Sequence, residues 1–240
     1  MKEKPMLFSG EAGLETKTTM KRLLPFIAMA AIGAVDHRYI PPPRHEVWET
    51  CTLWGDTGEV YSSTDNTVSF GFVYVCPKAA PVSFLTTPCI NGDLTGETIT
   101  ASISITTTGR PCFVYGFEGY PWNTCPSGAN VRLYFSCAPG PYDLDQANAD
   151  ECGYWWADFA AGSVNDILDA TLTASLTDPS QWSDSQGVSG ADEPEAFFVA
   201  VQNIAQVGLA FGGGCFYDTG VGIGKGGGSA TFHLKNYVVQ

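Results

Sequence analysis

Hydrophobic residues recur along most of this chain with a period of two, which is the spacing of a half-buried β-strand. Between Thr98 and Thr106, isoleucine and alanine occupy every second position, and threonine or serine occupies the positions between them. The same alternation occurs at 68–74, 131–135, 170–176 and 230–234, and weaker strands are predicted at 112–117, 153–159 and 207–211. Gly, Pro and Asn clusters separate these segments. The pattern predicts an all-β fold of two packed antiparallel sheets, a β-sandwich (jelly roll).

One helix is expected to interrupt the strands. Asp192 with Glu195 has the spacing of a capping box, and Pro194 falls in the first turn, where a missing N–H is tolerated. Apolar residues then recur at helical spacing at Phe197, Phe198, Val201 and Ile204. A second start signal at 178–182 has no apolar stripe after it, and it predicts a single helical turn.

The N-terminal segment has the features of an export signal. Lys21 and Arg22 precede an uncharged stretch, 23–35, which has the length of a signal-peptide core and is too short to cross a bilayer. We therefore expect a signal peptide within 1–34, an extended linker over 35–50 with a run of three prolines, and a single domain over 51–240.

Charge narrows the range of partners. The chain of 240 residues carries a formal net charge of −13, and no Lys or Arg occurs from Leu133 to Gly224. Nucleic acid and anionic membrane surfaces are therefore disfavoured as partners. No segment after Val35 is apolar and long enough to span a membrane.

Eight cysteines follow the export segment. An even number of cysteines after an export signal is typical of a secreted domain whose cysteines are paired in disulfides. The sequence by itself does not select among the possible connectivities. Spacing favours local pairs that each bracket a Pro- or Gly-bearing loop: Cys76 with Cys89, Cys112 with Cys125 and Cys137 with Cys152, which leaves Cys51 for Cys215. Zinc is disfavoured, because no C-x-x-C pair occurs.

No catalytic signature stands out. Asp143-x-Asp145 and Glu193-x-Glu195 have the spacing of paired carboxylates, but the first lies in a Pro-Gly loop and the second opens the helix. His233 alternates with apolar neighbours and is expected on a strand surface. No nucleophile elbow or phosphate loop is present in its full form.

Carbohydrate binding has a better physical basis, because sugar rings stack on exposed aromatic side chains while polar groups bond to their hydroxyls. In the run 154–156, alternation sends neighbouring aromatic residues to opposite faces of a strand, so at least one large ring is expected to face solvent or to lie at the rim of a sheet. The candidate ligand-binding residues are Tyr120, Trp122, Tyr154, Trp155, Trp156 and Trp182.

Calcium is the cofactor that the sequence suggests. Four carboxylates lie close together in a turn-rich loop, where hard oxygen ligands could converge: Asp143, Asp145, Asp150 and Glu151. Their spacing is not that of an EF-hand, and an ordinary acidic loop is the alternative.

Several segments resemble exported bacterial proteins of uncertain function. The similarity is found at 171–183, 211–216, 220–222 and 228–232, and at the earlier strands 94–101 and 130–135. Such proteins resemble galactose-binding-like and concanavalin-like jelly rolls, and some have a sorting tail with a Pro-Glu-Pro motif. This chain ends in Val238-Val239-Gln240, so an anchored-surface role is not expected. The resemblance implies a jelly-roll fold and supplies no catalytic residue.

Three classes of function remain open at this point. The first is a secreted or cell-surface binding module for a glycan or another extracellular ligand, with or without calcium. The second is a secreted hydrolase or lyase acting on polysaccharide. The third is a structural surface or matrix protein without a ligand site.

Overall fold

The computed structural model describes residues 47–52, 57–58, 60–62, 67–74, 81–115, 128–137, 153–158, 162–167, 169–214, 217 and 219–240. All of them belong to one of the chain's two units, His37–Gln240. The predicted signal peptide, together with Tyr120, Trp122 and the four predicted calcium ligands, lies outside the described residues.

The smaller of two sheets has five antiparallel strands in the order β11-β6-β15-β4-β3. Its strands are β3 (Tyr61–Ser62), β4 (Val68–Gly71), β6 (Thr98–Gly109), β11 (Ala170–Ser175) and β15 (Gly228–Val239). Alternation decides which side of β6 faces inward, since Ile99, Ala101, Ile103 and Ile105 are all buried. The predicted strand at 98–106 is therefore confirmed, and its polar positions face away from the core.

The larger sheet has ten strands, whose main path runs in the order β12-β9-β8-β13-β5-β1-β2. These strands are β1 (Glu49–Thr52), β2 (Thr57–Gly58), β5 (Val82–Thr87), β8 (Ala129–Ser136), β9 (Tyr154–Ala157), β12 (Trp182–Asp184) and β13 (Gln206–Gly213). Three short strands branch from the path: β10 (Gly162–Ser163) pairs with β8, and β14 (Val221–Ile223) pairs with β5 and with β7 (Phe113–Tyr115). The pairings between these named strands are all antiparallel.

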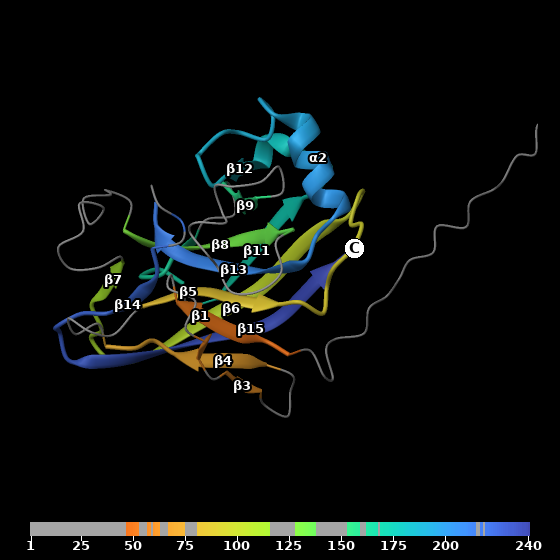
Figure 1. Ribbon diagram of the computed structural model, residues 1–240. Coiled ribbons are helices and arrows are strands. Elements are labelled where there is room, and N and C mark those ends of the chain that lie inside the picture. Colours follow the sequence, from red (N-terminus) through yellow and green to blue (C-terminus); the bar gives the residue numbers. More distant parts are fainter. Residues whose placement is uncertain are drawn as a thin grey trace, which may run out of the picture. The chain divides into compact units, whose positions relative to one another are not determined.

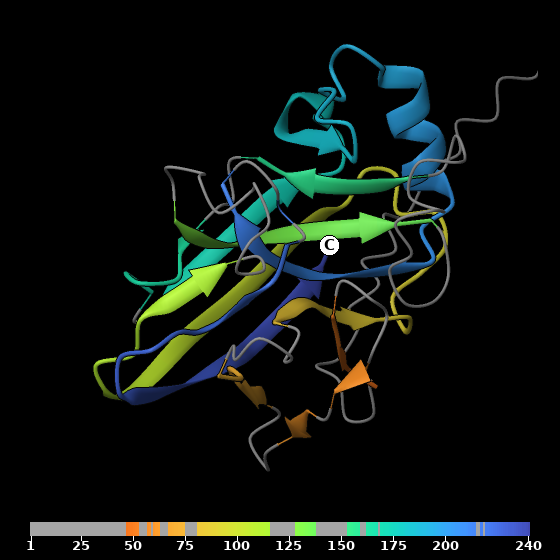
Figure 2. The same cartoon turned by 60° about the vertical axis from the view of Figure 1, so that its left-hand side comes forward.

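An aromatic core joins the two sheets. Phe70 of β4 and Phe232 of β15 stack on each other, and both rings meet Phe211 of β13 edge-on, at centroid distances of 5.5 Å and 5.1 Å. Figure 2 shows the long strands β6 and β15 of the smaller sheet running diagonally across the direction of β8 in the larger sheet. The fold is therefore all-β and sandwich-like, as predicted, while jelly-roll connectivity stays a prediction.

The larger sheet departs from the simple alternating pattern. Every residue of β5, β8, β9 and β13 is buried, on both faces of the sheet. A strand covered on both sides needs no polar face, so its sequence loses the period of two. For this reason β5 escaped prediction. The strands β1, β2, β3, β10, β12 and β14 escaped prediction because each has only two to four residues, too few to show a period.

The predicted helix is present as α2 (Pro194–Gln202), which packs beside β9 and β12 (Figure 1). Its Phe197 is fully buried and meets Trp155 edge-on, with ring centroids 5.2 Å apart. The predicted cap was wrong by one residue: Glu193 is the N-cap, without a side-chain hydrogen bond. The predicted single turn is also present, as η2 (Pro179–Gln181), and Asp178 caps it by accepting a hydrogen bond from the Ser180 N–H. No described helix is long and apolar enough to cross a membrane.

The described cysteines correct most of the predicted pairing. Cys51, Cys89 and Cys112 are free thiols, so the expected bonds from Cys51 to Cys215, from Cys76 to Cys89 and from Cys112 to Cys125 are not formed. Cys51 is buried in β1 and the other two are exposed. Cys137 is disulfide-bonded, and its partner is outside the described residues. No disulfide joins two described cysteines.

Candidate functional site

The outer side of the five-stranded sheet forms an extended surface of hydroxyl side chains, which we call the hydroxyl face. Because residues paired across antiparallel strands point to the same side, the register of β6, β11, β15, β4 and β3 defines its members. They are Thr98, Thr100, Ser102, Ser104, Thr106 and Thr108 of β6, Thr171, Thr173 and Ser175 of β11, Ser229, Thr231, His233, Asn236 and Val238 of β15, Ser69 and Gly71 of β4, and Tyr61 of β3.

Rows of the hydroxyl face cross the sheet. In one row Thr173 lies opposite Thr100, with 3.3 Å between their Oγ1 atoms. In a second row Ser104 of β6 pairs with His233, which pairs with Ser69, which in turn pairs with Tyr61. Neighbouring strands are about 4.8 Å apart, and successive outward residues of one strand are roughly 6.8 Å apart. The face therefore presents hydroxyl groups on a regular two-dimensional spacing.

The hydroxyl face carries no carboxylate, although the chain has a net charge of −13. Two described cations border it. Arg110 directly follows the end of β6, and Lys235 lies at the bulge of β15, with its Nζ 3.0 Å from Asp169 Oδ2. This ion pair is exposed at both ends, so it neutralises the charge locally without adding much stability. The face is consequently polar and uncharged.

Tyr61 provides the aromatic surface of this face. Its side chain is 64% exposed, the largest exposure of any aromatic residue in the described part of the chain. Thr106, Thr108, Thr171 and Thr173 are also exposed, and His233 is half-buried with its Nε2 2.9 Å from Thr106 Oγ1. An exposed ring thus lies at one end of a row of hydrogen-bonding groups.

The aromatic residues that the sequence suggested as ligand-binding are not on this face. Tyr154, Trp155 and Trp156 are 2–3% exposed and Trp182 is fully buried. No ring of the run 154–156 faces solvent, so that part of the expectation was wrong.

Both faces of β9 are covered, which explains this burial. Trp155 points toward the core between the sheets, where it stacks on Phe135 at 6.5 Å. Tyr154 and Trp156 point to the opposite side, into a separate cluster that also contains Tyr134 of β8. The two candidates that remain, Tyr120 and Trp122, lie outside the described residues.

A buried polar cluster lies on that opposite side of the larger sheet. The Arg132 side chain of β8 is 6% exposed, its guanidinium carbon is 3.6 Å from the ring centre of Tyr217, and its Nη1 donates to the Asp158 carbonyl at 3.0 Å. Ser183 Oγ donates to Asp158 Oδ1 at 2.8 Å. Trp156 touches the same tyrosine, edge-on at 6.2 Å.

Burial controls the protonation of this cluster. It raises the pKa of the Tyr217 phenol, an effect that the nearby Arg132 charge opposes. It also lowers the pKa of Arg132, against the opposing influence of Tyr217 and Asp158. A tyrosine with a raised pKa is a neutral hydrogen-bonding group at ordinary pH, so the cluster is better suited to binding than to general-base catalysis.

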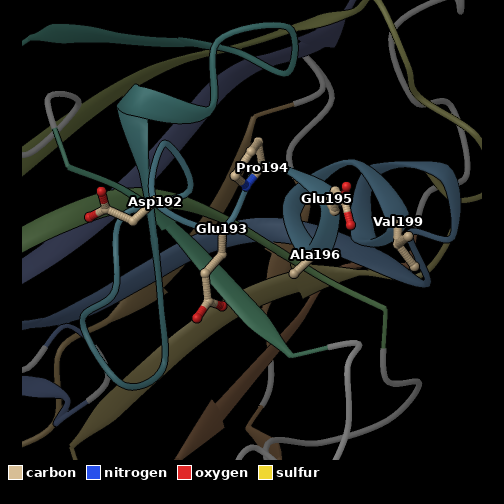
Figure 3. Close-up of a pocket in the computed structure, with 6 residues that line it drawn as sticks. All are labelled: Asp192, Glu193, Pro194, Glu195, Ala196 and Val199. Atoms are coloured by element: carbon tan, nitrogen blue, oxygen red, sulfur yellow. The ribbon is translucent and has the colours of Figure 1, made fainter.

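An open hollow of about 560 Å³ lies at the start of α2. It is lined by Asp192, Glu193, Pro194, Glu195, Ala196 and Val199. Figure 3 shows its three carboxylates pointing in different directions, so they do not form a common coordination site. Within the described ranges, no group of three or more His, Cys, Asp and Glu side chains is arranged to hold a metal.

No family model matches the chain, and no curated protein matches it.

Neither Tyr61 nor Arg132 was identified from the sequence as a site residue. The first lies in a two-residue strand, which is too short to show a period. The second had a usable signal, because it is the last cation before the long stretch without Lys or Arg and lies inside an apolar strand.

Proposed function

We propose that this protein is an extracellular β-sandwich module that binds neutral polysaccharide through the hydroxyl face. The observation that carries the proposal is the exposed ring of Tyr61 beside the half-buried Ser69 and His233, on a face whose exposed threonines are Thr106, Thr108, Thr171 and Thr173. The predicted export signal and acidic composition agree with an extracellular role.

The chemistry of the face fits sugar rings. Hydroxyl side chains both donate and accept hydrogen bonds, as sugar hydroxyls do, and threonine methyl groups together with the Tyr61 ring offer apolar contact to C–H groups. A regular array suits a polymer better than a single sugar, because weak contacts repeated along one chain add through effective concentration.

Charge favours a neutral ligand. A chain with a net charge of −13 repels an anionic polymer at long range, and none of the residues that make up the face is a Lys or Arg. Neutral polysaccharides avoid this repulsion altogether.

The test is retention on insoluble cellulose and chitin, with tyrosine variants chosen as a matched pair. Tyr61→Ala removes the exposed ring of the face, whereas Tyr74→Ala removes a ring that is 49% exposed but lies beyond β4, at a bridge to Ile223. We expect wild type and Tyr74→Ala to be retained on at least one of the two polymers, and Tyr61→Ala to bind roughly tenfold more weakly.

A second pair tests the hydroxyl groups. Thr173→Glu places a charge on the face, and Gln202→Glu places the same charge on the exposed side of α2. Loss of retention in Thr173→Glu alone supports the proposal. If wild type is not retained on either polymer, or if both charge variants bind like wild type, the proposal is wrong.

The same retention assay, repeated with the chelator EDTA, tests whether binding needs calcium. Because the hydroxyl face has no carboxylate, we expect its binding to persist in EDTA. A loss of retention in EDTA would instead favour the predicted site at Asp143, Asp145, Asp150 and Glu151, and would contradict binding by the hydroxyl face alone.

A further inference from the structure

Two buried hydrogen-bond donors around Tyr217 have no acceptor. Arg132 Nε and Trp156 Nε1 are both inaccessible to solvent and make no hydrogen bond. Both side chains contact the Tyr217 ring: the guanidinium carbon lies over it, and the indole meets it in a T-shaped contact. An unpaired buried donor costs about 1–3 kcal/mol, and more when it is charged, so two donors on side chains that pack against the same ring call for an acceptor.

Among the described residues, the groups near Tyr217 do not supply that acceptor. The Asp158 carbonyl accepts from Arg132 Nη1, and one oxygen of its carboxylate accepts from Ser183. Within the described part of the chain, the one ion pair closer than 4.0 Å is that of Lys235 with Asp169, so Arg132 has no carboxylate at contact distance. The Asp158 carboxylate acts on the guanidinium from a greater distance and does not accept a hydrogen bond from it.

We propose that Arg132 and Trp156 form a binding site for a small anion, on the side of the larger sheet away from the five-stranded sheet. The anion would accept one hydrogen bond from the guanidinium Nε and one from the indole Nε1, beside the ring of Tyr217. Chloride and a free carboxylate share this chemistry, since each accepts both bonds and supplies a negative charge at contact distance. This site does not depend on the hydroxyl face, so either proposal can fail while the other stands.

Thermal unfolding in defined salts tests the site. The protein is unfolded in three salts at constant ionic strength and pH. Gluconate is the reference, because this anion is too bulky for a buried site, and chloride or acetate replaces it in the other two. A ligand that binds the native state alone raises Tm by roughly 3–5 °C for each tenfold increase in concentration above its dissociation constant. We expect this rise in wild type with at least one of the two anions, and the arm that responds identifies the anion.

Two variants separate binding from a general salt effect. Arg132→Met removes the charge and the donors, and Trp156→Phe keeps an aromatic ring but removes the indole N–H. Both should lose most of the anion-dependent rise in Tm, while Trp155→Phe, which removes an indole N–H on the opposite face of β9, should keep it. If Arg132→Met does not fold, the comparison of Trp156→Phe with Trp155→Phe still decides.

Other outcomes overturn the proposal. An equal Tm of wild type in all three salts would show that a water molecule or nothing occupies the space. An equal rise in wild type and both site variants would show an unspecific effect of the salt.

Discussion

The guanidinium carbon of Arg132 lies 3.6 Å from the centre of the Tyr217 ring, so a buried cation rests on an aromatic face. A desolvated contact of this kind contributes about 2 kcal/mol. The contact joins β8 to the segment between β13 and β14, which are far apart in the sequence.

We therefore predict that Tyr217→Leu lowers the free energy of unfolding by about 2 kcal/mol, because it exposes the guanidinium to an apolar side chain that cannot compensate its charge. Tyr217→Phe keeps the ring and should lose less than half as much. Urea unfolding followed by tryptophan fluorescence measures both. Equal losses in the two variants would show that the phenol hydroxyl, and not the ring, stabilises Arg132.

Alkaline pH should destabilise the fold through Cys51. Burial, followed by the charge of Glu49, raises the pKa of the Cys51 thiol from 9.0 to about 11. The unfolded chain loses this proton at lower pH than the native protein. The contribution of the protonated Cys51 thiol to the free energy of unfolding is therefore complete below pH 9, and it disappears as pH rises toward 11. Burial also raises the pKa values of Tyr134 and Tyr217, which act in the same direction above pH 10.

Between pH 9 and pH 10, the free energy of unfolding of wild type should thus fall by about 1 kcal/mol more than that of Cys51→Ala. Urea unfolding at each pH measures both. Cys89→Ala, which removes an exposed thiol, is the control and should follow wild type. A parallel loss in all three proteins would assign the alkaline instability to other groups.

Thiol labelling should distinguish the three free cysteines. Without reductant, iodoacetamide is expected to modify Cys89 and Cys112 in the native protein, and Cys51 only after unfolding, because Cys51 is 3% exposed. Peptide mass mapping measures the extent at each position. Complete protection of all three in denaturant would support the four bridges predicted from cysteine spacing and contradict the structure.

Gly208 of β13 lies where two strands approach closely. A Cβ at this position would collide with the Leu85 carbonyl of β5, whereas a Cβ at Gly71 of β4 would meet nothing within 4 Å. We expect Gly208→Ala to lower the free energy of unfolding by about 1–3 kcal/mol through this overpacking.

Gly71→Ala is the matched control and should leave stability unchanged or raise it by up to about 1 kcal/mol, because alanine restricts the unfolded chain. Chemical denaturation compares the two variants. A harmless Gly208→Ala would mean that β5 and β13 can separate without loss of stability.

The elements that depend on local periodicity and helix caps could be predicted from the amino-acid sequence. Alternation at 98–106 identified β6 and the side of it that is buried, and apolar spacing after Pro194 identified α2. These features need only the geometry of one strand or one helix, in which the positions of side chains follow from residue number.

Tertiary structure decided which polar and aromatic residues meet and which are covered. The threonines of β6 became part of a wide face because β11 and β15 pair with β6 in a particular register. That register joins residues up to 140 positions apart, as between Ile99 of β6 and Val239 of β15. The run 154–156 was expected to place an aromatic ring in solvent or at a sheet rim, but the larger sheet is buried on both faces there. Burial depends on what the rest of the chain places over a strand, and no local pattern records it.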